Sequence, residues 1–168
     1  EKTRINVESN FTGMTHLYVY RNRKALPRFF TVEQVEVLKN PDEVMARLTQ
    51  ASVENLRRIA FVNSPDLPQG LGAATSLAPA QVTLNRYTSD RIDISIRGNG
   101  KRPSLLIVTN SYSPFWKVRV EGVPATLFPA DHTFWGVLLP SGARTVSFSF
   151  EPPYGRFLYR PELALAGA

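Results

Sequence analysis

The chain of 168 residues contains no cysteine and only two histidines, His16 and His132. The lack of cysteine excludes a disulfide framework, a thiolate zinc or iron–sulfur site and a cysteine nucleophile. Two histidines exclude a multi-histidine metal centre, and known metal sites need three or four converging ligands. We therefore predict no metal and no cofactor for this chain.

Long apolar runs and catalytic motifs are also missing. No run of 18 apolar residues occurs, so the chain as given is not expected to span a membrane. It begins at Glu1 without an initiator methionine or a signal peptide, which indicates an excised or processed piece. There is no Gly-x-Ser-x-Gly elbow, no Walker phosphate loop and no His-Glu-x-x-His motif. The carboxylates are scattered over turns and strand ends, so a stand-alone hydrolase is the least favoured hypothesis.

The composition is that of one globular domain with a basic surface. Hydrophobic residues make up 43% and charged residues 20% of the chain. Twenty Lys and Arg against fourteen Asp and Glu give a net charge of +6, which would attract phosphates or anionic lipid headgroups. The basic run at 21–24 lies in an expected turn without stacking aromatics. Nucleic acid is therefore not an expected partner.

Strand signals dominate the chain. Residues 92–96 alternate strictly between isoleucine and polar side chains, and turn signals separate similar segments at short, regular spacing. One helix is expected over 41–50, because Asn40 can cap it, Pro41 suits its first position and Glu43 completes a capping box. We predict a mainly β fold, an antiparallel β-sandwich of jelly-roll or immunoglobulin-like type, with one short helix near residues 41–50. The expected strands are 17–20, 28–38, 59–62, 82–87, 92–96, 105–108, 116–120, 125–128, 134–139 and 146–150.

Composition along the chain divides it into four parts. Residues 1–62 are expected to supply N-terminal strands and a helix that pack on the sandwich. Residues 63–80 contain three prolines and two glycines and read as a loop or linker. Residues 81–155 form the predicted sandwich core. Residues 156–168 form a C-terminal tail that could lead to a removed membrane helix.

Aromatic side chains gather in two neighbouring stretches, 112–116 and 134–135, beside polar residues at 131–132. Aromatic platforms with nearby polar groups suit sugar rings, but a sandwich core would bury the same side chains. Alternation along a strand places Phe134 and Trp135 on opposite faces. The candidate ligand-binding residues are Tyr112, Trp116, Asp131, His132 and Trp135.

Several turn motifs point to one family. Residues 106–118 read LIVTNSYSPFWKV and are followed by Val-Glu-Gly at 120–122, Pro-Ser-Gly at 140–142 and a strand that ends in Glu-Pro at 151–152. Together with Ala-Leu-Pro-Arg-Phe at 25–29, this pattern resembles the C-terminal soluble extracytoplasmic region of bacterial YfhO-type polytopic membrane proteins, which are similar to GT-C glycosyltransferases. The chain departs from the family pattern at Phe115, where the family has glycine, and at Glu121, where it has aspartate.

The resemblance implies a multi-spanning parent similar to membrane glycosyltransferases that use lipid-linked sugars, with this portion on the extracytoplasmic face of the bacterial cytoplasmic membrane. The expected function is non-catalytic assistance in recognising a glycan or cell-envelope polymer. The expected partners are that polymer and the membrane region of the parent protein. The alternative is a structural or protein-interaction β-sandwich that binds no ligand and uses its exposed sheet edges.

Overall fold

The computed structural model describes residues 2–5, 17–20 and 22–152. Near the N-terminus, β1 (Lys2–Ile5) pairs antiparallel with β2 (Leu17–Tyr20). The predicted C-terminal tail, residues 156–168, lies outside the described residues.

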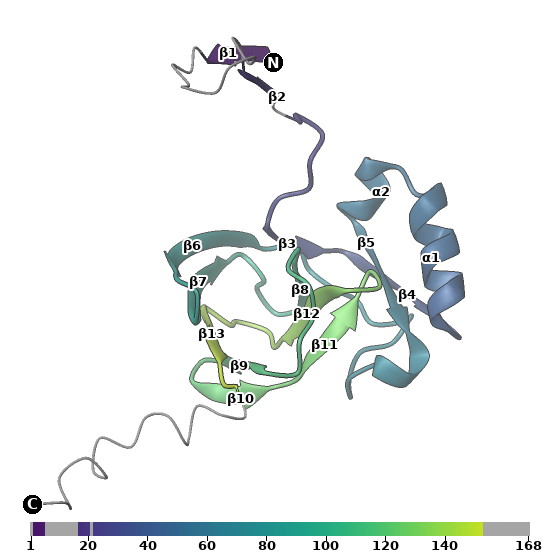
Figure 1. The fold of residues 1–168 in the computed structure, drawn as a ribbon. Helices are drawn as coiled ribbons and strands as arrows, with labels where there is room; N and C mark the ends of the chain where they lie inside the picture. Colours follow the sequence, from purple (N-terminus) through teal and green to yellow (C-terminus); the bar gives the residue numbers. More distant parts are fainter. Residues whose placement is uncertain (1, 6–16, 21, 153–168) are drawn as a thin grey trace, which may run out of the picture.

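Two antiparallel sheets form the body of the fold (Figure 1). The larger sheet has the order β10-β9-β13-β7-β6, and the smaller has the order β11-β12-β8-β3. The strands of the larger sheet are β6 (Gln81–Tyr87), β7 (Arg91–Arg97), β9 (Trp116–Val120), β10 (Val123–Ala125) and β13 (Thr145–Phe150). Those of the smaller sheet are β3 (Phe29–Val32), β8 (Ser104–Val108), β11 (Leu127–Ala130) and β12 (Phe134–Leu139).

The main core fills the space between these two sheets. Alternating side chains of β7, β9 and β13 point inward and meet side chains of β8 and β12. The intervening residues of β7, β9 and β13 are more exposed, so the outer face of the larger sheet is not covered by another layer of the described chain. The core side chains include Ile92, Ile94, Ile96, Val118, Val146, Phe148, Leu106, Val108, Trp135 and Val137.

A second apolar cluster covers the other face of the smaller sheet. It joins β3, β8 and β11 to a parallel pair of strands, β4 (Gln34–Leu38) and β5 (Ile59–Asn63), and to the loop that follows β5. All five residues of β8 are buried, because this strand has a core on each face. The fold is therefore a sandwich with a third, smaller layer on one side (Figure 1).

The helices belong to this third layer. The helix α1 (Pro41–Gln50) packs on β5 and buries Val44. Its start is as predicted: the Asn40 side chain accepts a hydrogen bond from the Glu43 amide at 2.9 Å, and Pro41 occupies the first turn. A four-residue helix, α2 (Val53–Leu56), and a 3₁₀ turn, η1 (Ser64–Asp66), were not expected.

The predicted β-sandwich is confirmed, with two differences of detail. The expected strand 28–38 is divided into β3 and β4 at Glu33, and the two halves enter different sheets. Because β3 is itself a strand of the smaller sheet, the segment before residue 62 contributes to the sandwich as well as packing on it. The expected strand 125–128 is two strands, β10 and β11, since the chain crosses from one sheet to the other there.

Candidate functional site

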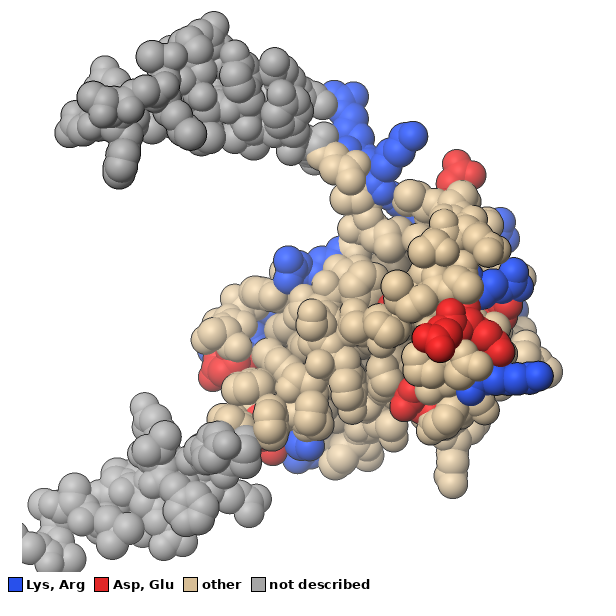
Figure 2. All heavy atoms as spheres, turned by 45° about the vertical axis from the view of Figure 1, so that its right-hand side comes forward, with Lys and Arg blue, Asp and Glu red and all other residues tan. Residues whose placement is uncertain are grey.

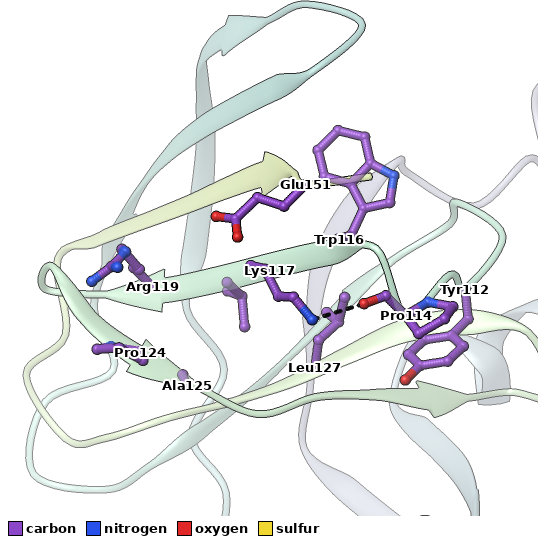
Figure 3. A pocket seen from close by; sticks show the side chains of 10 residues that line it. Tyr112, Pro114, Trp116, Lys117, Arg119, Pro124, Ala125, Leu127 and Glu151 are labelled. Carbon is purple, nitrogen blue, oxygen red and sulfur yellow. Dashed lines mark hydrogen bonds between the residues drawn. The ribbon is translucent and has the colours of Figure 1, made fainter. Parts of the chain in front are cut away.

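A hollow of about 360 Å³ runs along β9 and is called the β9 hollow below (Figure 3). Tyr112 and Pro114 lie at one end of it, and Arg119 and Pro124 lie at the other (Figure 3). Its volume falls in the range of small-ligand sites. The lining residues are Tyr112, Pro114, Trp116, Lys117, Val118, Arg119, Pro124, Ala125, Leu127 and Glu151.

Two of the predicted residues line this hollow. Tyr112 is 38% exposed, and its backbone amide donates to the Thr133 carbonyl at 2.6 Å, which fixes the loop that carries the ring. Trp116 is half-buried, with its ring centroid 4.9 Å from that of Trp135 and 5.5 Å from that of Phe150. Core contacts therefore hold the Trp116 ring in place, while the Tyr112 phenol reaches solvent.

Two cationic side chains also line the hollow, and one of them, Arg119, lies at the end opposite Tyr112 (Figure 3). The Lys117 ammonium donates to the Pro114 carbonyl at 2.9 Å (Figure 3). The Arg119 guanidinium donates to the Gly122 carbonyl at 3.1 Å. Both cations are held by backbone carbonyls, and Glu151, which accepts from the Ser149 hydroxyl at 3.2 Å, is the one carboxylate among the lining residues. The hollow thus combines aromatic, cationic and carboxylate groups.

Trp135 is in the core rather than on a surface. It is 1% exposed, its ring packs against Phe148 and its indole N–H donates to the Ser111 carbonyl at 2.8 Å. Its pairing opposite Val108 turns this face of β12 toward the larger sheet, whereas Phe134 packs on the opposite face. As a ligand-binding candidate Trp135 is therefore withdrawn, because its indole is enclosed and its donor is used.

Asp131 and His132 form a turn between β11 and β12, and both have left-handed backbones, with φ of 47° and 72°. Asp131 is buried, and its side chain accepts from the Phe61 amide at 2.8 Å. His132 is exposed and lines a separate hollow of about 110 Å³ beside α1. The five predicted residues thus divide among the β9 hollow, the core and this turn.

Comparison with protein-family models, curated proteins and solved structures finds no match.

No helix in the described ranges has both the length and the apolar character needed to cross a membrane. Within the same ranges, no three His, Asp or Glu side chains are grouped closely enough to hold a metal ion. Over the helical side of the molecule, acidic and basic side chains are intermingled (Figure 2). Two exposed ion pairs, Arg47–Glu36 and Arg58–Glu33, lie there, so this side carries no strong charge of one sign.

The sequence analysis missed Lys117 and Arg119 as parts of the site. A signal for them was present, because alternation along 116–120 buries Val118 and Val120 and leaves the two cations outside. Pro124 and Leu127 carried no such signal. Pro124 reaches the hollow because β10 folds back on β9 through a tight turn, in which Glu121 and Gly122 have φ of 52° and 78°. Leu127 reaches it from β11 of the smaller sheet.

Proposed function

We propose that this chain is a non-catalytic β-sandwich that recognises a glycan or cell-envelope polymer through the β9 hollow. The observation that carries the proposal is the combination of the exposed Tyr112 ring, the fixed Trp116 ring and the two cations Lys117 and Arg119 around one hollow. Sugar rings present apolar C–H faces that pack on aromatic rings and hydroxyl edges that need hydrogen-bonding partners. The hollow offers both kinds of contact.

A binding assay with matched tyrosine variants tests this proposal. Tyr112→Ala is expected to weaken binding to a panel of purified cell-envelope glycans by at least about fivefold, since it removes an aromatic contact worth about 1 kcal/mol. Tyr87→Ala removes another exposed tyrosine, on β6, and is expected to leave binding unchanged. Lys117→Ala measures the contribution of a cation to glycan binding separately from that of the aromatic ring. Lys117 is suited to this because it is exposed and its ammonium bonds a loop carbonyl rather than a core residue.

Glycan binding that is equal in all these variants, in proteins with unchanged melting temperature, would contradict the proposal. So would the absence of binding to every glycan of the panel at millimolar concentration.

The resemblance to YfhO-type proteins supports the further proposal that this domain lies on the extracytoplasmic face of the bacterial cytoplasmic membrane, as part of a membrane glycosyltransferase-like protein. This part of the proposal is tested separately, in the open reading frame that encodes the chain. Flanking apolar segments of about 18 or more residues are expected there. Their absence would refute the membrane assignment but would not affect the proposal that the β9 hollow binds a glycan.

One observation favours the alternative, a protein-interaction module. β6 is an edge of the larger sheet, and along its seven residues only Val82 is not exposed. Leu84 is 46% exposed at the centre of this edge, where another strand could add. The alternative predicts that the domain forms a complex with the membrane region of its parent, that Leu84→Lys abolishes this complex, and that no glycan binds.

A further inference from the structure

A second hollow, of about 680 Å³, lies at the other end of β13 from Glu151 and is called the β7–β13 hollow. The end of β7 with the turn after it forms one wall, and the turn before β13 forms the other. Arg97 and Arg144 come from opposite walls. The lining residues are Ser95, Ile96, Arg97, Gly98, Asn99, Gly100, Gly142, Ala143, Arg144 and Thr145.

The charged side chains that line this hollow are both positive. No carboxylate lines it, and within residues 22–152 neither Arg97 nor Arg144 forms an ion pair. The nearest acid in the hydrogen-bond network is Glu121, whose Oε1 accepts from the Arg144 and Thr145 amides and from the Thr145 hydroxyl. That oxygen is occupied by three donors, and Glu121 is close enough to Arg144 to attract it electrostatically. Within the described residues no hydrogen bond engages the Arg97 or Arg144 guanidinium group, so their donors can serve another acceptor.

The two walls are fixed relative to each other. Asn99 is 3% exposed, and its amide donates to the Pro140 carbonyl at 2.9 Å, which ties the turn after β7 to the turn before β13. The Ile96 amide donates to the Arg144 carbonyl at 2.8 Å, so the two backbones are also joined inside the hollow. The site is therefore formed before any ligand arrives, which lowers the entropic cost of binding.

The backbone in this hollow is open to a ligand. Gly98, Gly100 and Gly142 have φ of 92°, 53° and 74°, and a Cβ built on any of them would meet nothing within 4 Å. Turns of this kind leave backbone amides accessible, and such amides are suited to oxyanions. Ser95 adds a further donor: its hydroxyl oxygen accepts from Asn85 at 2.6 Å, so its own proton remains free to donate.

Two arginines, a serine and glycine turns thus line this space, and no carboxylate is among the described residues that line it; Glu121, behind the Arg144–Thr145 backbone, offsets part of the Arg144 charge. We propose that the β7–β13 hollow binds a phosphate group carried by a linear, phosphate-bearing polymer. Guanidinium groups match the geometry of phosphate oxygens and remain charged at every physiological pH. The site shares no residue with the β9 hollow, so the proposal does not depend on glycan recognition there.

The surface around this hollow favours a polymer, rather than a membrane surface, as the source of the bound phosphate. A neighbouring hollow of about 480 Å³ shares Arg97 and Gly98 with this one, and Lys101 and Arg102 follow in the same turn, so the basic surface extends beyond one phosphate. Large exposed apolar side chains occur elsewhere in the described chain, and none of them lines either hollow. A membrane-surface site would need such side chains to enter the lipid.

Titration of the domain with tripolyphosphate and with poly(glycerol phosphate), followed by calorimetry, tests the proposal. Arg97→Gln/Arg144→Gln is expected to weaken binding of both probes by at least about tenfold, because two charge-assisted contacts are lost. The matched control Lys39→Gln/Arg86→Gln removes two exposed positive charges elsewhere, on either side of the described fold, and is expected to change binding by less than about twofold.

Three outcomes would overturn the proposal. The first is no binding of either probe at millimolar concentration. The second is equal weakening in the two double variants, which would show attraction by net charge alone. The third is binding of phosphatidylglycerol vesicles that requires Arg97 and Arg144 without any binding of the soluble probes, which would assign the site to a lipid surface. Tyr112→Ala is expected to leave phosphate binding unchanged. The glycan proposal can therefore fail without affecting the phosphate proposal, and the two failures can be told apart.

Discussion

Asp131 joins the smaller sheet to the β4–β5 layer. Its amide donates to the Phe61 carbonyl at 2.8 Å, and its carboxylate Oδ1 accepts from the Phe61 amide at the same distance. Asp131 is 5% exposed, and its second oxygen, Oδ2, is buried and has no hydrogen-bond partner among the described residues. Burial raises the pKa of Asp131 from 3.8 to about 6, and the hydrogen bond from Phe61 opposes this only in part.

The raised pKa fixes the sign of a pH effect. Because the folded protein binds this proton more tightly than the unfolded chain, the stabilising effect of protonation is fully present below about pH 3.8 and is lost as the pH rises through about 6. Above that pH the buried charge lowers the free energy of unfolding by up to about 3 kcal/mol, at roughly 1.4 kcal/mol per pKa unit. Asp131→Asn keeps the acceptor for Phe61, tolerates the left-handed backbone and removes the charge.

Asp131→Asn is therefore expected to raise the free energy of unfolding by about 1–3 kcal/mol near pH 8 and to change it by less than about 1 kcal/mol near pH 4. Urea unfolding followed by tryptophan fluorescence measures both values, since Trp116 and Trp135 contact the core. Asp93→Asn is the control: its ion pair with Arg91 is at the surface and contributes little. A lower stability of Asp131→Asn near pH 8, or a gain that does not depend on pH, would refute the reasoning.

Three further substitutions test which contacts stabilise the fold. Glu121→Gln is expected to lower the melting temperature near pH 7, because backbone and hydroxyl hydrogen bonds from Arg144 and Thr145 stabilise the Glu121 carboxylate and lower its pKa. This stabilisation is present above about pH 4.5 and is lost on acidification, so the melting temperatures of wild type and variant should converge at acidic pH. Gly136→Ala is expected to cost about 1–3 kcal/mol in urea unfolding, since its Cβ would lie 2.6 Å from the Phe128 ring, and the penalty should shrink in a Phe128→Leu background. Asn40→Ala is expected to cost about 1 kcal/mol through loss of the α1 cap, whereas Asn40→Asp should retain most of the stability.

Sequence patterns could predict the elements with strong periodicity. Residues 92–96 alternate in sequence, and β7 alternates in burial. The three-residue β10 carried no such pattern, because Pro124 interrupts it and the strand is exposed. The parallel pairing of β4 with β5 was also hidden, since it depends on a crossover through α1 and α2 rather than on either strand.

The site residues were harder to predict than the strands. Alternation requires Phe134 and Trp135 to face opposite ways, but the inward side is decided by pairing with β8, which is distant in sequence. Nothing in the sequence separates a buried aspartate in a turn from an exposed one, so the enclosure of Asp131 by the β4–β5 layer was not foreseeable. Arg97 and Arg144 likewise line one hollow only because β7 and β13 pair with Ser95 opposite Thr145.

The layering of the fold explains where both proposed sites lie. The smaller sheet has a core on each face, so its strands leave little surface for a polar ligand. The larger sheet is covered on one face only, and its strand ends carry the turns that supply Tyr112 and Pro114 at one end of β13 and Gly98 and Gly142 at the other. Both proposed sites therefore lie along strands and turns of the larger sheet, which within the described fold keeps an open face.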